Sequence, residues 1–326
     1  MTDLSPLHRW LPATLALSIA ALLFGLAAGS SGWGYVGGDI FFGVRLPRVL
    51  AGFGTGAALA LAGALMQLLT RNALADPSVL GVSSGAAVGS MLALLWLPAS
   101  LSLVGSMLGA MLGAALATLL LLALTWRVLA RPGVLSPAGE GSVTLLLLGV
   151  MIGSGSAALI ALLLSLAPEV QLRGLVFWLL GDLNGALHWW PVCLALFFAL
   201  LLALPQAGNL DAISRGDAWA TTLGVPVARC RRLVLGAAAL ATGAAVATAG
   251  AIGFVGLVVP HALRLLGVRA AAALLPASAL AGGAMVVLVD AVARTVFAPQ
   301  QIPVGVLAAA VGVPVFVTLL LRGRVR

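Results

Sequence analysis

Three arginines and one aspartate are the side chains best placed to do chemistry at one end of this chain. Arg45 and Arg48 flank Pro47, and Asp290 precedes Arg294 by four residues. Residues three or four apart share one face of a helix, so Asp290 and Arg294 are expected to form a local ion pair. A guanidinium group binds carboxylates through paired, charge-assisted hydrogen bonds. The chemistry that these residues predict is therefore ion pairing.

Motifs for covalent or ATP-hydrolysing chemistry are absent from the sequence. A phosphate-binding P-loop requires a lysine, and all 17 basic residues of this chain are arginine. The patterns H-E-x-x-H, G-x-S-x-G and C-x-x-C do not occur, and Cys193 and Cys230 lie far apart. We therefore expect no enzyme activity, no metal site and no cofactor in this chain.

The composition is that of a membrane protein. Hydrophobic residues make up 62% of the 326 residues, charged residues only 8%, and the mean hydropathy is +1.17. Ordinary soluble domains carry about 25% charged residues, and a membrane span needs about 20 apolar residues. The sequence predicts an all-α polytopic membrane protein, a single domain over 1–326 with about ten spans. The expected spans are 11–29, 44–70, 79–97, 101–125, 143–167, 187–205, 230–251, 254–268, 271–297 and 302–321.

The distribution of arginine predicts the orientation of these spans. Ten spans place both termini on one side of the membrane, and all arginines except Arg45, Arg48, Arg173 and Arg294 then fall on that side. Because basic loops stay in the cytoplasm, both termini are expected inside. Pro47 favours a helix start, so Arg45 and Arg48 can both point toward the outer aqueous phase. Snorkelling to lipid headgroups is the alternative for the outer arginines.

A polar elbow separates the second span from the third. Small residues recur along the second span and allow a neighbouring helix to approach closely; they are Gly52, Gly54, Gly56, Ala60 and Gly63. Gln67 lies near the end of this span, where a polar side chain needs a partner. The elbow itself contains Arg71, Asn72, Asp76 and Pro77.

Three further segments depart from the pattern of plain apolar spans. Residues 169–182 are too short to cross the membrane and predict a short outer helix beside His188, which we interpret as an interfacial histidine. Residues 208–226 form the longest polar stretch and predict two short cytoplasmic helices with breaks at Gly216 and Gly224. The glycines and serines of the fifth span, at 149–155, favour either very close packing or a water-filled path.

The order of these motifs resembles that of a known family. R-L-P-R at 45–48, G-A-A-L-A-L-A-G-A-L-M-Q at 56–67 and R-N-x-L-A-D-P-x-x-L-G at 71–81 are similar to FecCD-type permease subunits of binding-protein-dependent ABC importers for iron–siderophores, haem and vitamin B12. Residues 177–183, 208–226 and 249–264 match further elements of the same family. Two positions depart from it: Ala73 replaces the usual proline and Asp217 the usual glutamate.

The resemblance implies a type II ABC importer permease fold and a set of partners. These are a second copy of the chain, with the pore on the two-fold axis, two separate ATPase subunits that bind ATP and magnesium, and a soluble periplasmic binding protein. The implied location is the bacterial inner membrane, and the implied mechanism is alternating access. The resemblance does not choose between siderophore, haem and cobalamin as substrate.

It also implies roles for particular residues. The cytoplasmic gate is expected at Asn72, Leu74 and Ser142. ATPase coupling is expected at Gly216, Asp217, Ala218, Leu223 and Gly224, in a loop borne on the surface. Docking of the binding protein is expected at Arg45, Arg48 and Arg294.

A stand-alone secondary transporter or channel is the alternative. Ion-coupled transporters bury carboxylates near the membrane midplane, and Asp290 is the candidate for such a role, although Arg294 can neutralise it. The polar stretch at 208–226 favours the importer subunit.

Overall fold

The computed structural model describes residues 5–29, 37–76, 81–129, 140–186, 188–296, 298 and 300–323, and all regular structure in these ranges is helical. The helices are α1 (Ser5–Ala27), α2 (Gly38–Ile40), α3 (Leu46–Thr70), α4 (Val82–Trp96), α5 (Ala99–Leu129), α6 (Glu140–Leu166), α7 (Glu169–Leu179), α8 (Trp190–Ala203), α9 (Ala207–Arg215), α10 (Asp217–Thr222), α11 (Val227–Ala249), α12 (Val255–Leu265), α13 (Ala271–Thr295) and α14 (Val304–Gly323).

The predicted spans are confirmed. Seven segments of the described chain are long and apolar enough to cross a membrane, and they contain α1, α3, α5, α6, α8, α11 and α13. Three shorter apolar helices, α4, α12 and α14, account for the other predicted spans. The short outer helix is α7, and the polar stretch 208–226 folds as α9 and α10 with breaks at Gly216 and Gly224, as expected.

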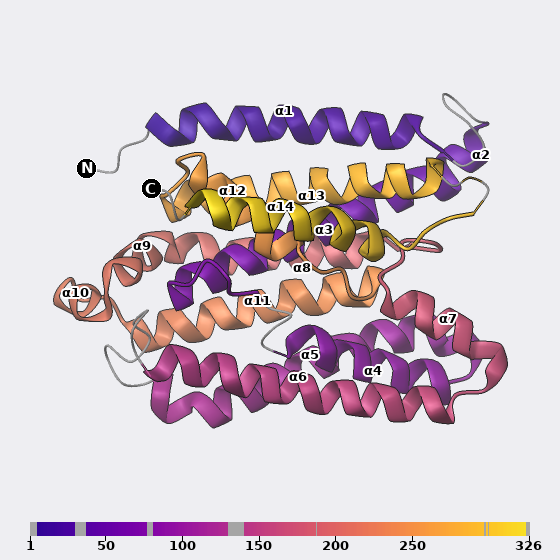
Figure 1. Ribbon diagram of the computed structural model, residues 1–326, viewed down its shortest axis with the longest axis horizontal. Coiled ribbons are helices and arrows are strands. Elements are labelled where there is room, and N and C mark those ends of the chain that lie inside the picture. Colours follow the sequence, from indigo (N-terminus) through magenta and orange to yellow (C-terminus); the bar gives the residue numbers. More distant parts are fainter. Residues whose placement is uncertain are drawn as a thin grey trace.

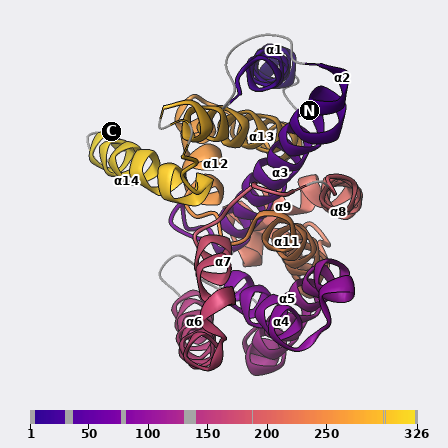
Figure 2. The same cartoon turned by 90° about the vertical axis from the view of Figure 1, so that its right-hand side faces the viewer.

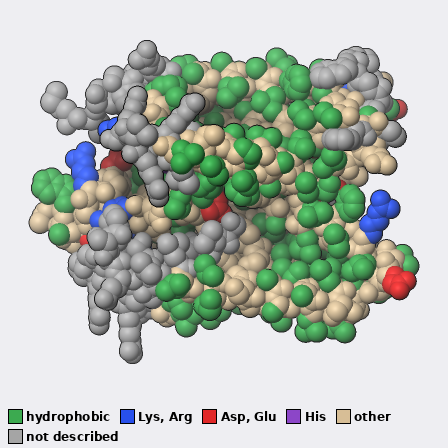
Figure 3. Space-filling model, viewed as in Figure 1, with side chains coloured by type: hydrophobic (Ala, Val, Ile, Leu, Met, Phe, Trp, Pro, Cys, Tyr) green, Lys and Arg blue, Asp and Glu red, His purple; other side chains and the backbone are tan. Residues whose placement is uncertain are grey.

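The long helices lie side by side and α3 runs through their centre (Figures 1 and 2). α13, α11, α12 and α8 surround α3, whereas α1, α6 and α14 lie at the periphery. α9 and α10 project from one end of the bundle, where α1 begins and α14 ends, and α2 and α7 lie at the opposite end (Figure 1). Apolar side chains cover the flank between these ends, and charged side chains gather mostly toward the ends (Figure 3).

Glycines along α3 let three helices touch its backbone. A Cβ atom built on Gly63 would lie 1.9 Å from the carbonyl oxygen of Gly256 in α12, and one on Gly56 would lie 2.2 Å from that of Gly282 in α13. A Cβ atom built on Gly54 would lie 2.8 Å from the side chain of Val192 in α8. The predicted close approach is therefore confirmed, and it occurs on several faces of α3 rather than one.

Gln67 resolves a hydrogen-bonding problem that Pro260 creates in α12. A proline at 260 has no N–H to donate to the carbonyl of Gly256, four residues earlier. The amide nitrogen of Gln67 donates instead to the carbonyl oxygens of Gly256 and Leu257, at 3.2 and 3.1 Å, and its amide oxygen accepts from Arg264. Because lipid offers no water to an orphaned carbonyl, this buried glutamine ties α3 to α12.

A second close contact joins α4 to α5 through two pairs of glycines. A Cβ on Gly89 would lie 2.0 Å from the carbonyl oxygen of Gly109, and one on Gly113 would lie 2.1 Å from that of Gly85. Both helices carry glycines four residues apart, the spacing that allows backbones to approach in a membrane. This pair packs beside α6 and α11.

The elbow after α3 is less exposed than its polar sequence suggests. The helix ends at Arg71, whose φ of +51° is left-handed, and Gly81 has a φ of +78° before α4. Asp76 is buried, and its carboxylate lies where a side chain on Gly256, in the first turn of α12, would stand. The end of the described elbow, Ala75 and Asp76, therefore packs inward, with Asp76 against α12, while Pro77 lies outside the described residues.

The first prediction concerns the contact between α3 and α12. Gly63→Ala should destabilise the folded protein by about 1–3 kcal/mol, because the added methyl group overlaps the backbone of Gly256. Gly236→Ala in α11 is the matched control, because a Cβ there meets nothing within 4 Å. The control should be neutral or slightly stabilising, since alanine is the better helix former. The measurement is the melting temperature of each variant in detergent. Equal melting temperatures for Gly63→Ala and Gly236→Ala would contradict the contact.

Candidate functional site

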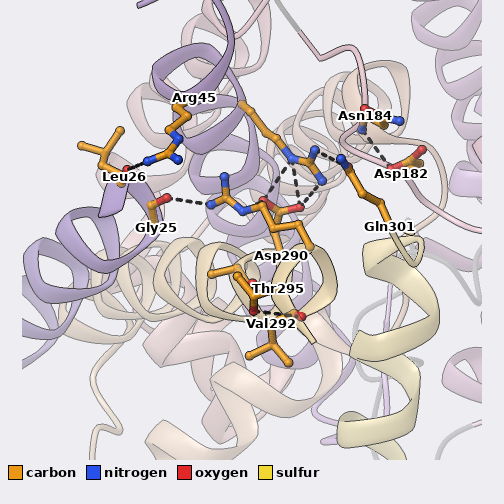
Figure 4. Close-up of polar contacts among 12 residues, drawn as sticks. Gly25, Leu26, Arg45, Asp182, Asn184, Asp290, Val292, Thr295 and Gln301 are labelled. Atoms are coloured by element: carbon orange, nitrogen blue, oxygen red, sulfur yellow. Dashed lines mark hydrogen bonds and ion pairs between the residues drawn. The ribbon is translucent and has the colours of Figure 1, made fainter. Parts of the chain in front are cut away.

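At the end of the bundle that carries α2 and α7, which is the predicted outer end, Asp290 of α13 holds two arginines (Figure 4). Arg48 donates from Nε to both carboxylate oxygens at 3.2 Å and from Nη2 to Oδ1 at 2.8 Å. Arg294, one turn along α13, places Nε 3.4 Å from Oδ2, so the predicted local pair is confirmed. Arg48 also donates to Gln301 at 2.7 Å, in the segment before α14. One carboxylate with 2% exposure thus joins α3, α13 and this segment.

Two arginines also cap the end of α1. Arg45 donates to the carbonyl oxygens of Leu26 and Ala27, at 3.2 and 3.4 Å, and Arg294 donates to that of Gly25 at 2.7 Å. The last carbonyls of a helix have no partner within the helix, and cations are favoured at that end. The two guanidinium groups therefore complete α1.

The expectation that Arg45 and Arg48 point toward the aqueous phase is wrong for this structure. Arg45, Arg48 and Arg294 are all buried. α3 begins at Leu46 with Pro47 in its first turn, as expected, but it continues directly from a π turn over Phe41–Arg45, in which the N–H of Leu46 bonds to the carbonyl of Phe41, five residues back. This turn and the preceding α2 continue the helical segment of α3 beyond the arginines. Docking of a binding protein at these residues stays a prediction.

A cavity of about 200 Å³ lies next to this cluster. Trp178, Asp182, His188 and Thr248 are among its lining residues. Burial raises the pKa of the Asp182 carboxyl, and this effect outweighs the hydrogen bond from the Asn184 N–H and the positive charge of Arg48. Asp182 is therefore a weaker acid than an exposed aspartate, and its proton affinity is tied to the arginine cluster.

At the opposite end, Asp217 holds a second pair of arginines. Its Oδ1 lies 3.1 Å from Nη2 of Arg71, and its Oδ2 lies 2.5 Å from Nη2 of Arg231. Asp217 is the first residue of α10, Arg71 follows the last residue of α3, and Arg231 lies in the second turn of α11. Asp217 is 2% exposed and Arg231 is fully buried. The expectation of a surface-borne loop is therefore wrong for Asp217.

The outer face of α10 is exposed and apolar. Trp219 and Leu223 are 52% and 59% exposed, and Ala218 is exposed beside them. Gly216 and Gly224 bracket the helix with φ values of +134° and +76°, which favour glycine. α10 projects from the bundle (Figure 1), and the exposed side chains of Trp219 and of Leu223, which follows the last residue of α10, form an apolar knob there.

The predicted gate residues are only partly placed. The Asn72 side chain accepts a hydrogen bond from the Leu74 N–H at 2.9 Å, which forms a tight turn directly after α3. Leu74 is 47% exposed. Ser142 lies in the first turn of α6, but its side chain is outside the described residues. The structure therefore brings Asn72 and Leu74 together and leaves the gate itself a prediction.

Residues 13–322 match the FecCD transport family. The chain belongs to that family.

Curated relatives extend this match over nearly the whole chain. The vitamin B12 import system permease protein BtuC of Escherichia coli O9:H4 (strain HS) is 39% identical over 333 residues, which cover 97% of this chain and 96% of the relative. The BtuC protein of Shigella boydii serotype 18 (strain CDC 3083-94 / BS512) has the same identity and coverage. A solved structure, described as an inward-facing conformation of a metal-chelate type ABC transporter, superposes with a TM-score of 0.81 and 29% identity over 96% of this chain and 98% of its own. This FecCD protein is accordingly a multi-span permease of the ABC importer class.

Sequence reasoning found most residues of both polar clusters in this FecCD chain but missed their partners. It placed Arg71 and Arg231 on one side of the membrane without linking them to Asp217, and it did not link Arg48 to Asp290. It also left Trp219 unremarked. An aromatic residue in an otherwise polar stretch was the available signal for the exposed knob.

The second prediction concerns the outer cluster. Asp290→Asn should lower the stability of the protein by about 3–5 kcal/mol, because it leaves Arg48 and Arg294 buried without a negative charge. Asp39→Asn in α2 removes an exposed carboxylate at the same end and should change stability by less than about 0.5 kcal/mol. Thermal unfolding in detergent measures both, and a wild-type melting temperature for Asp290→Asn would show that the cluster does not depend on this carboxylate.

Proposed function

We propose that this chain is the membrane-spanning subunit of a vitamin B12 importer. The observation that carries the proposal is the 39% identity to BtuC permeases over nearly the full length of both chains. The relation to a metal-chelate type transporter supports iron chelates as the second candidate class. Both are bulky, metal-containing solutes, so the two candidates require a wide path of the same kind.

The path is formed by two copies of the chain. α6 supports this, because Ser154 is exposed on it and a side chain at Gly155 would meet open space. A hydroxyl on the unpacked face of a spanning helix is costly in lipid and suits a water-filled path. α6 and α14 both lie at the periphery (Figure 2), and exposed apolar side chains along α14 leave a face for the partner copy.

Energy comes from a separate ATPase that docks on α9 and α10 at the cytoplasmic side. The apolar knob of Trp219 and Leu223 suits insertion into a cleft of that subunit, because exposed aromatic side chains such as that of Trp219 are typical anchors of interfaces, and Leu223 adds apolar surface beside it. The arginines near α9 and α10 support a cytoplasmic location for this end, where α1 also begins and α14 ends. Asn72, Leu74 and Ser142 would close the path at this end.

A periplasmic binding protein would deliver the solute at the outer end. The outer cluster holds three arginines, Arg45, Arg48 and Arg294, against the single carboxylate of Asp290, and this excess positive charge suits an acidic partner. Such complementarity mainly raises the rate and fixes the register of association.

Uptake into proteoliposomes tests the proposed function. The chain is reconstituted with its ATPase and binding protein, and ATP-dependent uptake of cobalamin is compared with that of ferric siderophore and haem. Uptake of cobalamin alone supports the first candidate. Uptake of an iron chelate alone would replace it with the second, and ATP-independent uptake by the isolated chain would instead indicate a stand-alone transporter.

The third prediction concerns the apolar knob. Changing Trp219 and Leu223 together to alanine should weaken the ATPase complex at least about tenfold, because interface anchors of this kind contribute about 2 kcal/mol or more each. Leu266→Ala, at the end of α12 and 57% exposed, is the control at the same end of the bundle. Co-purification of the ATPase with each variant is the measurement. Equal recovery with the double variant and the control would mean that the ATPase docks elsewhere.

A further inference from the structure

A single buried carboxylate connects the exposed knob of α10 to the end of the central helix. Asp217 begins α10, and its two oxygens contact different elements: Oδ1 contacts Arg71 at the end of α3, and Oδ2 contacts Arg231 in α11. Neither arginine lies on α10. Any displacement of α10 therefore acts on both helices through charge-assisted hydrogen bonds, which are stronger and shorter than neutral ones.

The contact with Arg71 lies directly beside the elbow. Arg71 precedes Asn72, whose side chain bonds to the N–H of Leu74. The backbone of Arg71 is left-handed, with φ of +51° and ψ of +31°. This conformation costs a non-glycine residue about 1 kcal/mol or more, so surrounding contacts must hold it in place. The ion pair with Asp217 is one such contact.

Charge makes the arrangement sensitive to the carboxylate. Burial lowers the pKa of Arg71, Asp217 opposes that effect, and Arg231 adds to it. Two guanidinium groups share one counter-charge, so neutralising Asp217 leaves two like charges facing each other. Gly216 lies against the same side chain, since a Cβ built there would stand 4.0 Å from Nη1 of Arg71.

We propose that Asp217 is a positioning residue that transmits movement of α10 to the elbow through Arg71. The inference rests on the proposed docking of the ATPase on α9 and α10, and it adds the route by which docking reaches the gate. Arg231 is the fixed point of this route, because it is fully buried in α11. Arg71 is the movable arm, because its backbone lies at the junction between a regular helix and a turn.

Asp217→Asn tests the route in the complete reconstituted importer. The amide keeps the size of the side chain and removes the charge. ATP hydrolysis should continue, whereas uptake per ATP should fall by about 5- to 150-fold, the range of ordinary allosteric coupling. Cysteine at Asn72 reports on the elbow: crosslinking between the two copies should depend on nucleotide in the parent and not in Asp217→Asn. Asp211→Asn is the matched control, because Asp211 lies on α9 and its carboxylate accepts the N–H of Ala271 at 2.8 Å instead of binding an arginine of the Asp217 cluster.

Arg71→Gln keeps the test decisive if Asp217→Asn fails to assemble. This change removes the ion pair between Asp217 and Arg71 and leaves the Asp217–Arg231 pair and the knob of α10 in place. It should reproduce the loss of uptake per ATP and of nucleotide-dependent crosslinking. Uptake per ATP within twofold of the parent value in Arg71→Gln would overturn the route. Asp217→Glu keeps the negative charge, so loss of both uptake per ATP and nucleotide-dependent crosslinking in this variant would overturn it as well. Failure of the parent chain to recruit an ATPase would instead overturn the proposed function.

Discussion

The fold depends on one constraint: a backbone carbonyl buried in a membrane must find a donor within the protein. Pro260 breaks the hydrogen-bond ladder of α12, and Gln67 of α3 supplies the missing donor to Gly256. The close approach of Gly63 to the same residue makes this possible, because only a small side chain lets the two backbones lie so near. The hydrogen bond from Gln67 and the close contact of Gly63 therefore depend on each other, and together they fix α12 against α3.

Buried charged side chains obey a similar constraint, because each must find an opposite charge or a hydrogen-bond partner within the protein. Among the described residues, Asp290 holds Arg48 and Arg294, and Asp217 holds Arg71 and Arg231. Each of these carboxylates is shared by two arginines, and each group joins helices that are distant in sequence. A buried pair gains little net stability over apolar packing, but breaking one is costly. The clusters therefore act mainly to specify which helices meet at each end.

The sequence allowed the spans, the small-residue contacts of α3 and the glycine breaks around α10 to be predicted, because these follow from local periodicity and from glycine's backbone freedom. It did not reveal which carbonyl needs Gln67, because the proline responsible lies in another helix. It also suggested that Asp217 would be exposed, because the segment around it is polar. Burial of that carboxylate depends on arginines brought in by α3 and α11, and no local pattern records them. Arg45 and Arg48 were expected in water for a similar reason, since the capping of α1 by Arg45 and the pairing of Arg48 with Asp290 are tertiary contacts.

The two clusters give α3 a particular mechanical position. Arg48 near its start and Arg71 just past its end are each held by a carboxylate from a different helix, and the rise of α3 separates them by about 35 Å. Between these points, backbone contacts to α12 and α13 resist sliding of α3 against its neighbours. Movement is therefore easier at the irregular residues that border this body, which are Arg71, Gly216 and Phe254 with their positive φ values. These residues border the elbow, α10 and α12, so a rigid centre bordered by bends would allow α10 and the elbow to move without unpacking the core.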